Sequence, residues 1–270
     1  MEIREKMSLN LSLIKEKNPL IHHITNYVTV NDCANIVLAI GGSPVMADDL
    51  EEVAEMVGFA SALVLNIGTL NSRTIESMLV AGRRAKELGV PIILDPVGVG
   101  ATKLRTDTAE KLINELKPEV IRGNMSEIKV LAGQNVAIKG VDSLADEQGG
   151  SIIARTFATE QSCVIAITGK TDVVSDGRRV CLLDNGHRIL ADVTGTGCMT
   201  SSLIASCCGV SDDYFTASVA GIITMGLAGE KAQASLHHGE GIGTFRARLF
   251  DNIYNLSPET LAKEGKIRNE

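Results

Sequence analysis

The stretch Ala191–Thr200, which reads A-D-V-T-G-T-G-C-M-T, decides the fold of this chain. An apolar, strand-like run ends at Asp192, glycines follow at positions 195 and 197, and an uncharged segment rich in Ser, Ala and Cys begins at Cys198. This order predicts a strand, a tight turn and the N-terminus of a helix. Gly195 and Gly197 permit backbone angles that other residues resist, and they let peptide N–H groups approach a ligand closely.

A turn that opens a helix presents unpaired N–H donors and the positive end of the helix dipole. Both suit an anion, such as a phosphoryl group in transfer. An isolated G-x-G turn is more often a turn without a ligand, so the rest of the sequence must decide between the two interpretations.

Length and composition predict a single domain spanning residues 1–270. The chain has 270 residues with 44% apolar content, which is enough for one large core. Lys and Arg number 26 against 33 Asp and Glu, a formal charge of −7, and no basic run occurs. This balance argues against a nucleic-acid partner.

We expect a cytoplasmic protein that is neither secreted nor embedded in a membrane. The N-terminus M-E-I-R-E-K-M is charged and lacks the apolar core of a signal peptide. Two uncharged stretches, Val193–Ser211 and Tyr214–Gly229, are too polar or too short to span a bilayer and are predicted to be buried helices. The six cysteines show no paired framework, which favours free thiols in a reducing compartment.

Apolar strand-like runs alternate with helical patterns along the chain. After an extended piece at 19–26, we expect strands at 62–68, 91–95, 120–122 and 164–168. The helices are expected at 8–17, 32–40, 48–58, 72–88, 106–116, 126–132 and 143–160. Short strands at 171–175, 179–184 and 187–192 are predicted to be antiparallel, and the chain from 198 to about 265 to be helical. The pattern predicts an α/β fold with a mostly parallel central sheet and helices on both faces.

Polar residues or glycines stand where the expected strands end. They are Asn66, Gly68, Asp95, Arg122, Asn124, Thr168 and the 192–198 turn. Ligands of such folds bind at the carboxyl ends of the strands, although each position alone fits simple turn chemistry. Asp95 and Glu127 could hold Mg²⁺ as oxygen ligands, while Arg122 and the N–H groups of the turn could bind phosphate oxygens. Together these residues indicate phosphoryl transfer.

Two further features are ambiguous. The adjacent pairs His22-His23 and His237-His238 diverge on a strand or a helix, so a metal site would need partners that the sequence does not supply. Met46, in S-P-V-M-A, lies in a loop near a strand end and could either fill the core or line a substrate pocket.

These residues resemble a known superfamily. D-V-T-G-T-G-C at 192–198 is similar to the D-T-x-G-A-G-D signature of ribokinase-like proteins, and Asn124-Met-Ser-Glu127 matches their N-x-x-E motif. More specifically, the chain resembles the hydroxyethylthiazole kinase family over about residues 10–255. The segments that match it in order lie at 24–35, 41–47, 63–70, 93–102, 121–128, 138–143 and 164–169.

The resemblance implies a ribokinase-like fold and an ATP- and Mg²⁺-dependent kinase. The implied reaction phosphorylates the primary hydroxyl of 4-methyl-5-(2-hydroxyethyl)thiazole, in thiamine biosynthesis or salvage. It also implies a homotrimer with active sites between subunits. A ribokinase-like kinase for another alcohol, such as a hydroxymethylpyrimidine or pyridoxal, stays open as an alternative. So does a nucleotide-binding regulatory protein that has lost catalysis.

The resemblance also implies site residues. Substrate contacts fall on Asn26, Val28, Met46, Gly68, Gly195 and Cys198. ATP contacts fall on Arg122 and Thr168, and the Mg²⁺ and phosphate environment falls on Asp95, Asn124 and Glu127. We expect Gly195, Gly197 and Cys198 to take part in catalysis. Cys198 departs from the wider signature, which ends in an Asp that acts as base on the hydroxyl.

Overall fold

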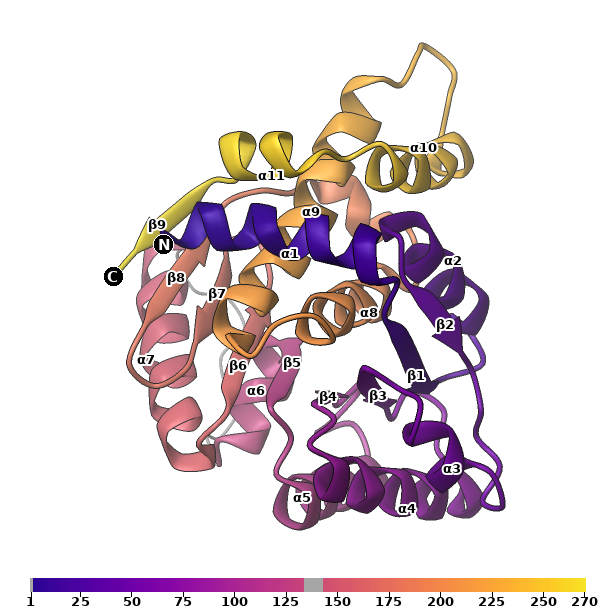
Figure 1. Ribbon diagram of the computed structural model, residues 1–270. Coiled ribbons are helices and arrows are strands. Elements are labelled where there is room, and N and C mark those ends of the chain that lie inside the picture. The colour runs from indigo at the N-terminus through magenta and orange to yellow at the C-terminus, as the bar shows by residue number, and fades with distance from the viewer. Residues whose placement is uncertain (1, 134–142) are drawn as a thin grey trace.

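The structure is a computed structural model that describes residues 2–133 and 143–270, and a single nine-stranded sheet forms its centre (Figure 1). The strands lie in the order β2-β1-β3-β4-β5-β6-β7-β8-β9 across the sheet. Their bounds are β1 Leu20–Ile24, β2 Ser43–Val45, β3 Ala62–Asn66, β4 Ile92–Asp95, β5 Val120–Asn124, β6 Val164–Thr168, β7 Asp172–Ser175, β8 Val180–Leu183 and β9 Ile267–Asn269. β1 to β6 pair in parallel, whereas β7, β8 and β9 pair antiparallel. The predicted fold class is confirmed.

Helices cover both faces of the sheet (Figure 1). One face packs against α1 Ile3–Lys17, α2 Val30–Ile40, α8 Thr196–Cys208, α9 Tyr214–Ala234, α10 Ile242–Tyr254 and α11 Pro258–Glu264. The other packs against α3 Val53–Val57, α4 Ser72–Leu88, α5 Lys103–Leu116, α6 Met125–Leu131 and α7 Ser143–Gln161. Because both faces are covered, strands such as β3 read as continuous apolar runs with every residue buried.

The strand register aligns the polar residues at the carboxyl edge of the sheet. Asn66 at the end of β3 pairs with Asp95 at the end of β4. Asn124 at the end of β5 pairs with Thr168 at the end of β6. The neighbouring strands therefore end at the same level, which brings their last side chains to one edge.

The expected strand at 187–192 is wrong. This segment forms a 3₁₀ helix, Arg188–Asp192, none of whose residues is buried. The edge of β8 is occupied instead by the unpredicted strand β9, in which Asn269 pairs with Cys181. Because β9 already satisfies the hydrogen bonds of that edge, the 187–192 segment has no strand to pair with there.

Other boundaries also differ from the sequence pattern. The three-residue strand β2 was not expected, and it includes Pro44, which is tolerated because β2 is an edge strand. The helix expected at 48–58 is restricted to α3. The first helix starts earlier than expected, at Ile3, because Glu2 and Glu5 form a capping box there.

The two uncharged stretches form α8 and most of α9 and are buried, as predicted. The two helices also pack closely against each other. A Cβ atom at Gly221 would lie 2.6 Å from the backbone nitrogen of Ile204, so only glycine allows this helix approach. Within residues 2–133 and 143–270, no helix combines the length and apolarity needed to cross a membrane.

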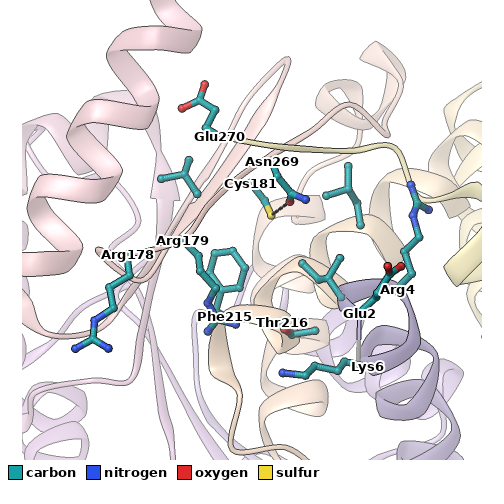
Figure 2. A pocket seen from close by; sticks show the side chains of 13 residues that line it. Glu2, Arg4, Lys6, Arg178, Arg179, Cys181, Phe215, Thr216, Asn269 and Glu270 are labelled. Carbon is teal, nitrogen blue, oxygen red and sulfur yellow. Dashed lines mark hydrogen bonds between the residues drawn. The ribbon is translucent and has the colours of Figure 1, made fainter.

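A cavity of about 570 Å³ lies at the opposite edge of the sheet, beside the start of β8 and the end of β9 (Figure 2). Its basic side chains come from α1 and from the turn before β8. Two of them are paired locally: Lys6 and Arg179 lie 2.7 and 2.9 Å from carboxylate oxygens of Asp213, and Arg179 also lies 2.7 Å from Asp176. This cavity is separate from the polar carboxyl edge described above.

Candidate active site

Two cavities lie next to each other at the carboxyl edge of the sheet. The smaller, of about 380 Å³, is lined by residues that include Asn26, Val28, Gly68, Asp95, Glu127, Gly195 and Cys198. The larger, of about 610 Å³, is lined by residues that include Thr168, Lys170, Asp172, His187, Arg188, Leu190, Ile222 and Met225. Arg122 and Gly197 line both cavities. The N-terminus of α8 therefore stands between two adjoining spaces.

The two glycines before and within α8 have different roles. Gly195 is the N-cap residue, its φ is +87°, and a Cβ atom there would lie 2.6 Å from Cγ2 of Thr29. Gly197 has no positive φ, so only close packing demands glycine there. A Cβ atom at Gly197 would lie 2.7 Å from Nη1 of Arg122. The sequence argument for unusual backbone angles thus holds at Gly195 and is wrong at Gly197.

Cys198 sits in the first turn of α8, where two amides donate to its sulfur. Nδ2 of Asn26 lies 3.4 Å and Nδ2 of Asn66 lies 3.3 Å from Sγ of Cys198. Burial, and then the nearby carboxylate of Asp95, raise the pKa of the Cys198 thiol, although the two amide donors and Thr29 lower it. The thiol is therefore protonated at neutral pH.

Asp95 is a fully buried carboxyl group whose two oxygens have different surroundings. Oδ2 accepts hydrogen bonds from Nδ2 of Asn66 at 3.0 Å and Oγ of Ser201 at 2.8 Å, with Nη1 of Arg122 at 3.7 Å. Oδ1 is buried and has no hydrogen-bond partner among the described residues. Burial raises the pKa of Asp95, opposed chiefly by the charge of Arg122. A lone buried carboxyl oxygen of this kind is suited to a cation or a bound water.

Glu127 belongs to a capping box at the start of α6. Its Oε2 accepts the backbone N–H of Asn124 at 2.8 Å, and Oδ1 of Asn124 accepts the N–H of Glu127 at 3.0 Å. The other oxygen, Oε1, accepts the N–H of Gly98 at 2.8 Å. Each oxygen of the Glu127 carboxylate is thus oriented by one backbone N–H, and each keeps lone pairs that can accept a further hydrogen bond or bind a cation.

Arg122 connects the two cavities through its hydrogen bonds. Its Nη2 donates to Oγ1 of Thr168, which lines the larger cavity, while Nη1 approaches Asp95 in the smaller one. Its Nε is buried without a hydrogen-bond partner among the described residues. The guanidinium is therefore placed to interact with a charged group lying between the two spaces.

Sequence reasoning missed several residues of this region. Asn66 was noted at a strand end but not assigned to the site, and Ser201 was not singled out. Ser201 lies three residues after Cys198 on one helix, a spacing that places both on the same helix face and could have revealed it. In the larger cavity, burial raises the pKa of Asp172 to about 7, and its Oδ1 accepts the N–H of Gly169 at 2.8 Å.

Met46 is a predicted site residue that the structure does not bring to the others. It follows the edge strand β2, is partly buried and lines neither cavity in the described chain. Val28, by contrast, lines the smaller cavity and is 59% exposed.

The histidines of β1 are internal. His22 Nε2 lies 2.8 Å from the carbonyl oxygen of Ala47, and His23 Nε2 lies 2.9 Å from Oγ of Ser202. Burial lowers the pKa of His23 to about 4, so its ring is neutral. No group of three or more His, Cys, Asp or Glu suited to a metal occurs within the part of the chain that the structure describes.

The fold is ribokinase-like. Three features define it: the order of the strands in the sheet, the position of the N-terminus of α8 between two cavities, and the polar residues at the strand ends. A structure of Staphylococcus aureus pyridoxal kinase in complex with AMP-PCP shows this fold at a TM-score of 0.62, with 14% identity, 93% of this chain and 98% of that chain covered.

The chain belongs to the hydroxyethylthiazole kinase family, whose model matches residues 11–259. The hydroxyethylthiazole kinase of Alkaliphilus oremlandii is 53% identical, with 99% of each chain covered. That of Clostridium tetani is 51% identical over 100% of each chain. The structure of a hydroxyethylthiazole kinase protein from Pyrococcus horikoshii has a TM-score of 0.88 and 38% identity, with 98% of each chain covered.

Proposed function

We propose that this protein transfers the γ-phosphoryl group of ATP to the primary hydroxyl of 4-methyl-5-(2-hydroxyethyl)thiazole, in thiamine biosynthesis or salvage. The larger cavity takes the nucleotide and the smaller one takes the thiazole. The observation that carries this assignment is that Arg122 of β5 and Gly197 at the N-terminus of α8 line both cavities. A phosphoryl group passing between the two ligands would meet a cation and free N–H groups there.

The site residues then have distinct roles. Arg122 neutralises charge on the transferred group. Thr168 lines the nucleotide cavity, whereas Asn124, its partner at the aligned strand ends, lines the smaller cavity together with Glu127, from which it would reach the terminal phosphates of the nucleotide. Asn26, Val28, Gly68 and Gly195 surround the thiazole. Cys198 lies beside the hydroxyl and, as a protonated thiol, is a weak base.

The residues present fit a divalent cation. Asp95 presents a buried oxygen, Oδ1, that lacks a hydrogen-bond partner in the described chain, and Glu127 lies in the same cavity wall. We propose that these two carboxylates hold Mg²⁺, directly or through water. When bound, the ion would neutralise charge on the nucleotide phosphates.

We also propose a homotrimer with active sites at subunit interfaces, formed by a single domain over residues 1–270 that works in the cytoplasm. Tyr27 and Val28, next to Asn26 in the cavity wall, are 79% and 59% exposed, and Leu38 on α2 is 55% exposed. Apolar side chains exposed beside a site support burial by another subunit. Met46 would then line the cavity of a neighbouring subunit. Light scattering checks the mass of the assembly, and a monomer would contradict this proposal.

The test of the activity is a substrate panel. Purified protein with Mg²⁺ and ATP is offered the hydroxyethylthiazole, a hydroxymethylpyrimidine or pyridoxal, and ADP release is followed in a coupled assay. We expect kcat/KM for the thiazole to exceed that for either other alcohol by at least ~10²-fold, because an alcohol that leaves polar groups of the cavity unpaired loses transition-state binding. A preference for another alcohol, or no release of ADP at all, would contradict the proposal.

A further inference from the structure

The guanidinium of Arg105 joins two loops at the carboxyl edge of the sheet. Arg105 is the third residue of α5, and its Nη1 donates to the carbonyl oxygens of Ile67 at 3.2 Å and Val97 at 2.6 Å. Its Nη2 donates to the carbonyl oxygen of Gly68 at 2.7 Å. These carbonyls belong to the loops after β3 and β4, and both Gly68 and Val97 line the smaller cavity.

Two of the peptide groups held by Arg105 donate on their other side to site residues. The structure has no cis peptide bond among its described residues, so the C=O and N–H of each peptide point in opposite directions. The peptide after Ile67 accepts from Arg105, and its N–H, on Gly68, donates to Oδ1 of Asn66 at 2.9 Å. The peptide after Val97 accepts from Arg105, and its N–H, on Gly98, donates to Oε1 of Glu127 at 2.8 Å.

Each peptide thus lies between the same cation and a polar side chain of the site. Consecutive hydrogen bonds polarise one another, so a positive charge at the carbonyl oxygen of a peptide strengthens the N–H of the same peptide as a donor. Asn66 in turn donates to Asp95 and to Cys198. Through the Gly68 peptide, Arg105 therefore reaches Asn66, which holds the carboxyl and the thiol of the site, and through the Gly98 peptide it reaches Glu127.

Several observations show that this arrangement favours arginine over lysine. Three carbonyls in two loops match the planar fork of a guanidinium, whereas the ammonium of lysine is a single point of contact. Gly98, with φ +75°, lies so close that a Cβ atom there would be 2.9 Å from Nη1 of Arg105. In the described residues Arg105 makes no ion pair with a carboxylate, so the three carbonyls are its main partners.

We propose that Arg105 is a positioning residue that orients Glu127 and Asn66 through the peptide groups of Gly98 and Gly68. It touches neither ligand. The inference rests on the proposed assignment of the smaller cavity to the thiazole.

The first test uses Arg105→Met and Arg105→Lys in the full-length enzyme. We expect Arg105→Met to lower kcat ~10-fold or more and to raise the thiazole KM several-fold, because small misplacements at a phosphoryl-transfer site are costly. Arg105→Lys keeps the charge and one hydrogen bond, so its kcat should fall between those of the Met variant and the native enzyme. Arg83→Met is the matched control, because Arg83 bridges α4 to Glu115 of α5 at 2.6 Å without contacting either loop. It should leave both constants unchanged.

The second test is a double-mutant cycle between Arg105→Met and Glu127→Gln. If Arg105 acts through Glu127, the kcat of the double variant should lie no more than about threefold below that of the less active single variant. The effects of two residues that act on one another do not add in free energy. Losses that multiply, or an unchanged thiazole KM in the folded Arg105→Met protein, would overturn the inference. An Arg105 variant of native activity beside a strongly impaired Glu127→Gln variant overturns it and leaves the proposed function standing. Native activity in Glu127→Gln would instead contradict the proposed site itself.

Discussion

The guanidinium of Arg122 lies against the backbone of Gly197, so closely that a Cβ atom at position 197 would be 2.7 Å from Nη1 and 3.0 Å from Nη2. Arg122 is itself bonded to Thr168 and lies near Asp95. The guanidinium of Arg122, the cation that a phosphoryl group would approach, therefore occupies the space beside Gly197. A change at Gly197 acts on Arg122 first.

Gly197→Ala is predicted to lower kcat by ~10²-fold or more, because the added methyl displaces the guanidinium from both cavities. The backbone at Gly197 suits alanine, so the variant should fold and keep its melting temperature within a few degrees. Gly243→Ala is the matched control. Gly243 is also the second residue of its helix, α10, and a Cβ atom there meets nothing within 4 Å. A folded Gly197→Ala enzyme of native activity would show that the turn only begins the helix.

Glu127→Gln is predicted to lower kcat at least ~30-fold while thiazole binding, measured by calorimetry, changes little. The substitution removes the charge proposed to act on Mg²⁺, and it places an amide NH₂ where a backbone N–H of Gly98 or Asn124 needs an acceptor. Glu5→Gln tests the capping role alone, because Glu5 occupies the same position in the capping box of α1 and is exposed. Turnover within about twofold of native for Glu127→Gln would place Glu127 outside the metal environment.

Cys198→Ala is predicted to lose less than ~10²-fold in kcat, and Cys198→Asp to equal or exceed the native enzyme. Burial raises the pKa of the native thiol, so little thiolate is available, whereas the amides of Asn26 and Asn66 can donate to a carboxylate placed at 198. Steady-state rates from pH 6 to 9, with thiazole affinity measured separately, check both expectations. A loss of ~10⁴-fold in Cys198→Ala, with a folded but inactive Cys198→Asp, would show that the thiol is indispensable.

Asp172→Asn is predicted to gain stability over the native protein as the pH rises from 5 to 8. Burial raises the pKa of Asp172 to about 7 in the folded chain, whereas an unfolded Asp titrates near ~4. Between these values the folded state binds more protons than the unfolded state, so ionisation costs folding free energy as the pH increases. The Asn variant keeps an acceptor for the N–H of Gly169 and lacks this penalty. Equal pH profiles of melting temperature for the two proteins would contradict the shifted pKa.

The sequence was sufficient to predict the parallel part of the fold because its strands are buried on both faces. Runs such as Ala62–Asn66 and Val164–Thr168 are continuously apolar and end in polar residues, so both their extent and their carboxyl ends are visible in the pattern. The aligned register then brings Asn66 next to Asp95. The predicted site residues other than Met46 consequently line two adjoining cavities, and Asn66 is buried behind them.

The antiparallel end of the sheet could not be predicted in the same way. An apolar triplet, Ile189–Ala191, suits a strand as well as a 3₁₀ turn, and the choice depended on whether β9 would pair with β8 from a distant part of the chain. The roles of Asn66 and Arg105 were also hidden. They follow from which atoms their planar groups meet across loops, and no spacing in the sequence encodes those contacts.

Because Arg122 belongs to the walls of both cavities, the two ligands cannot bind independently if either one moves it. A nucleotide that draws the guanidinium toward its phosphates changes the wall that the alcohol meets. Thermodynamic reciprocity then requires the alcohol to alter the Kd of the nucleotide by the same factor. On the proposed assignment of the two cavities, a single side chain would thereby couple the affinities for the two substrates before any bond is made or broken.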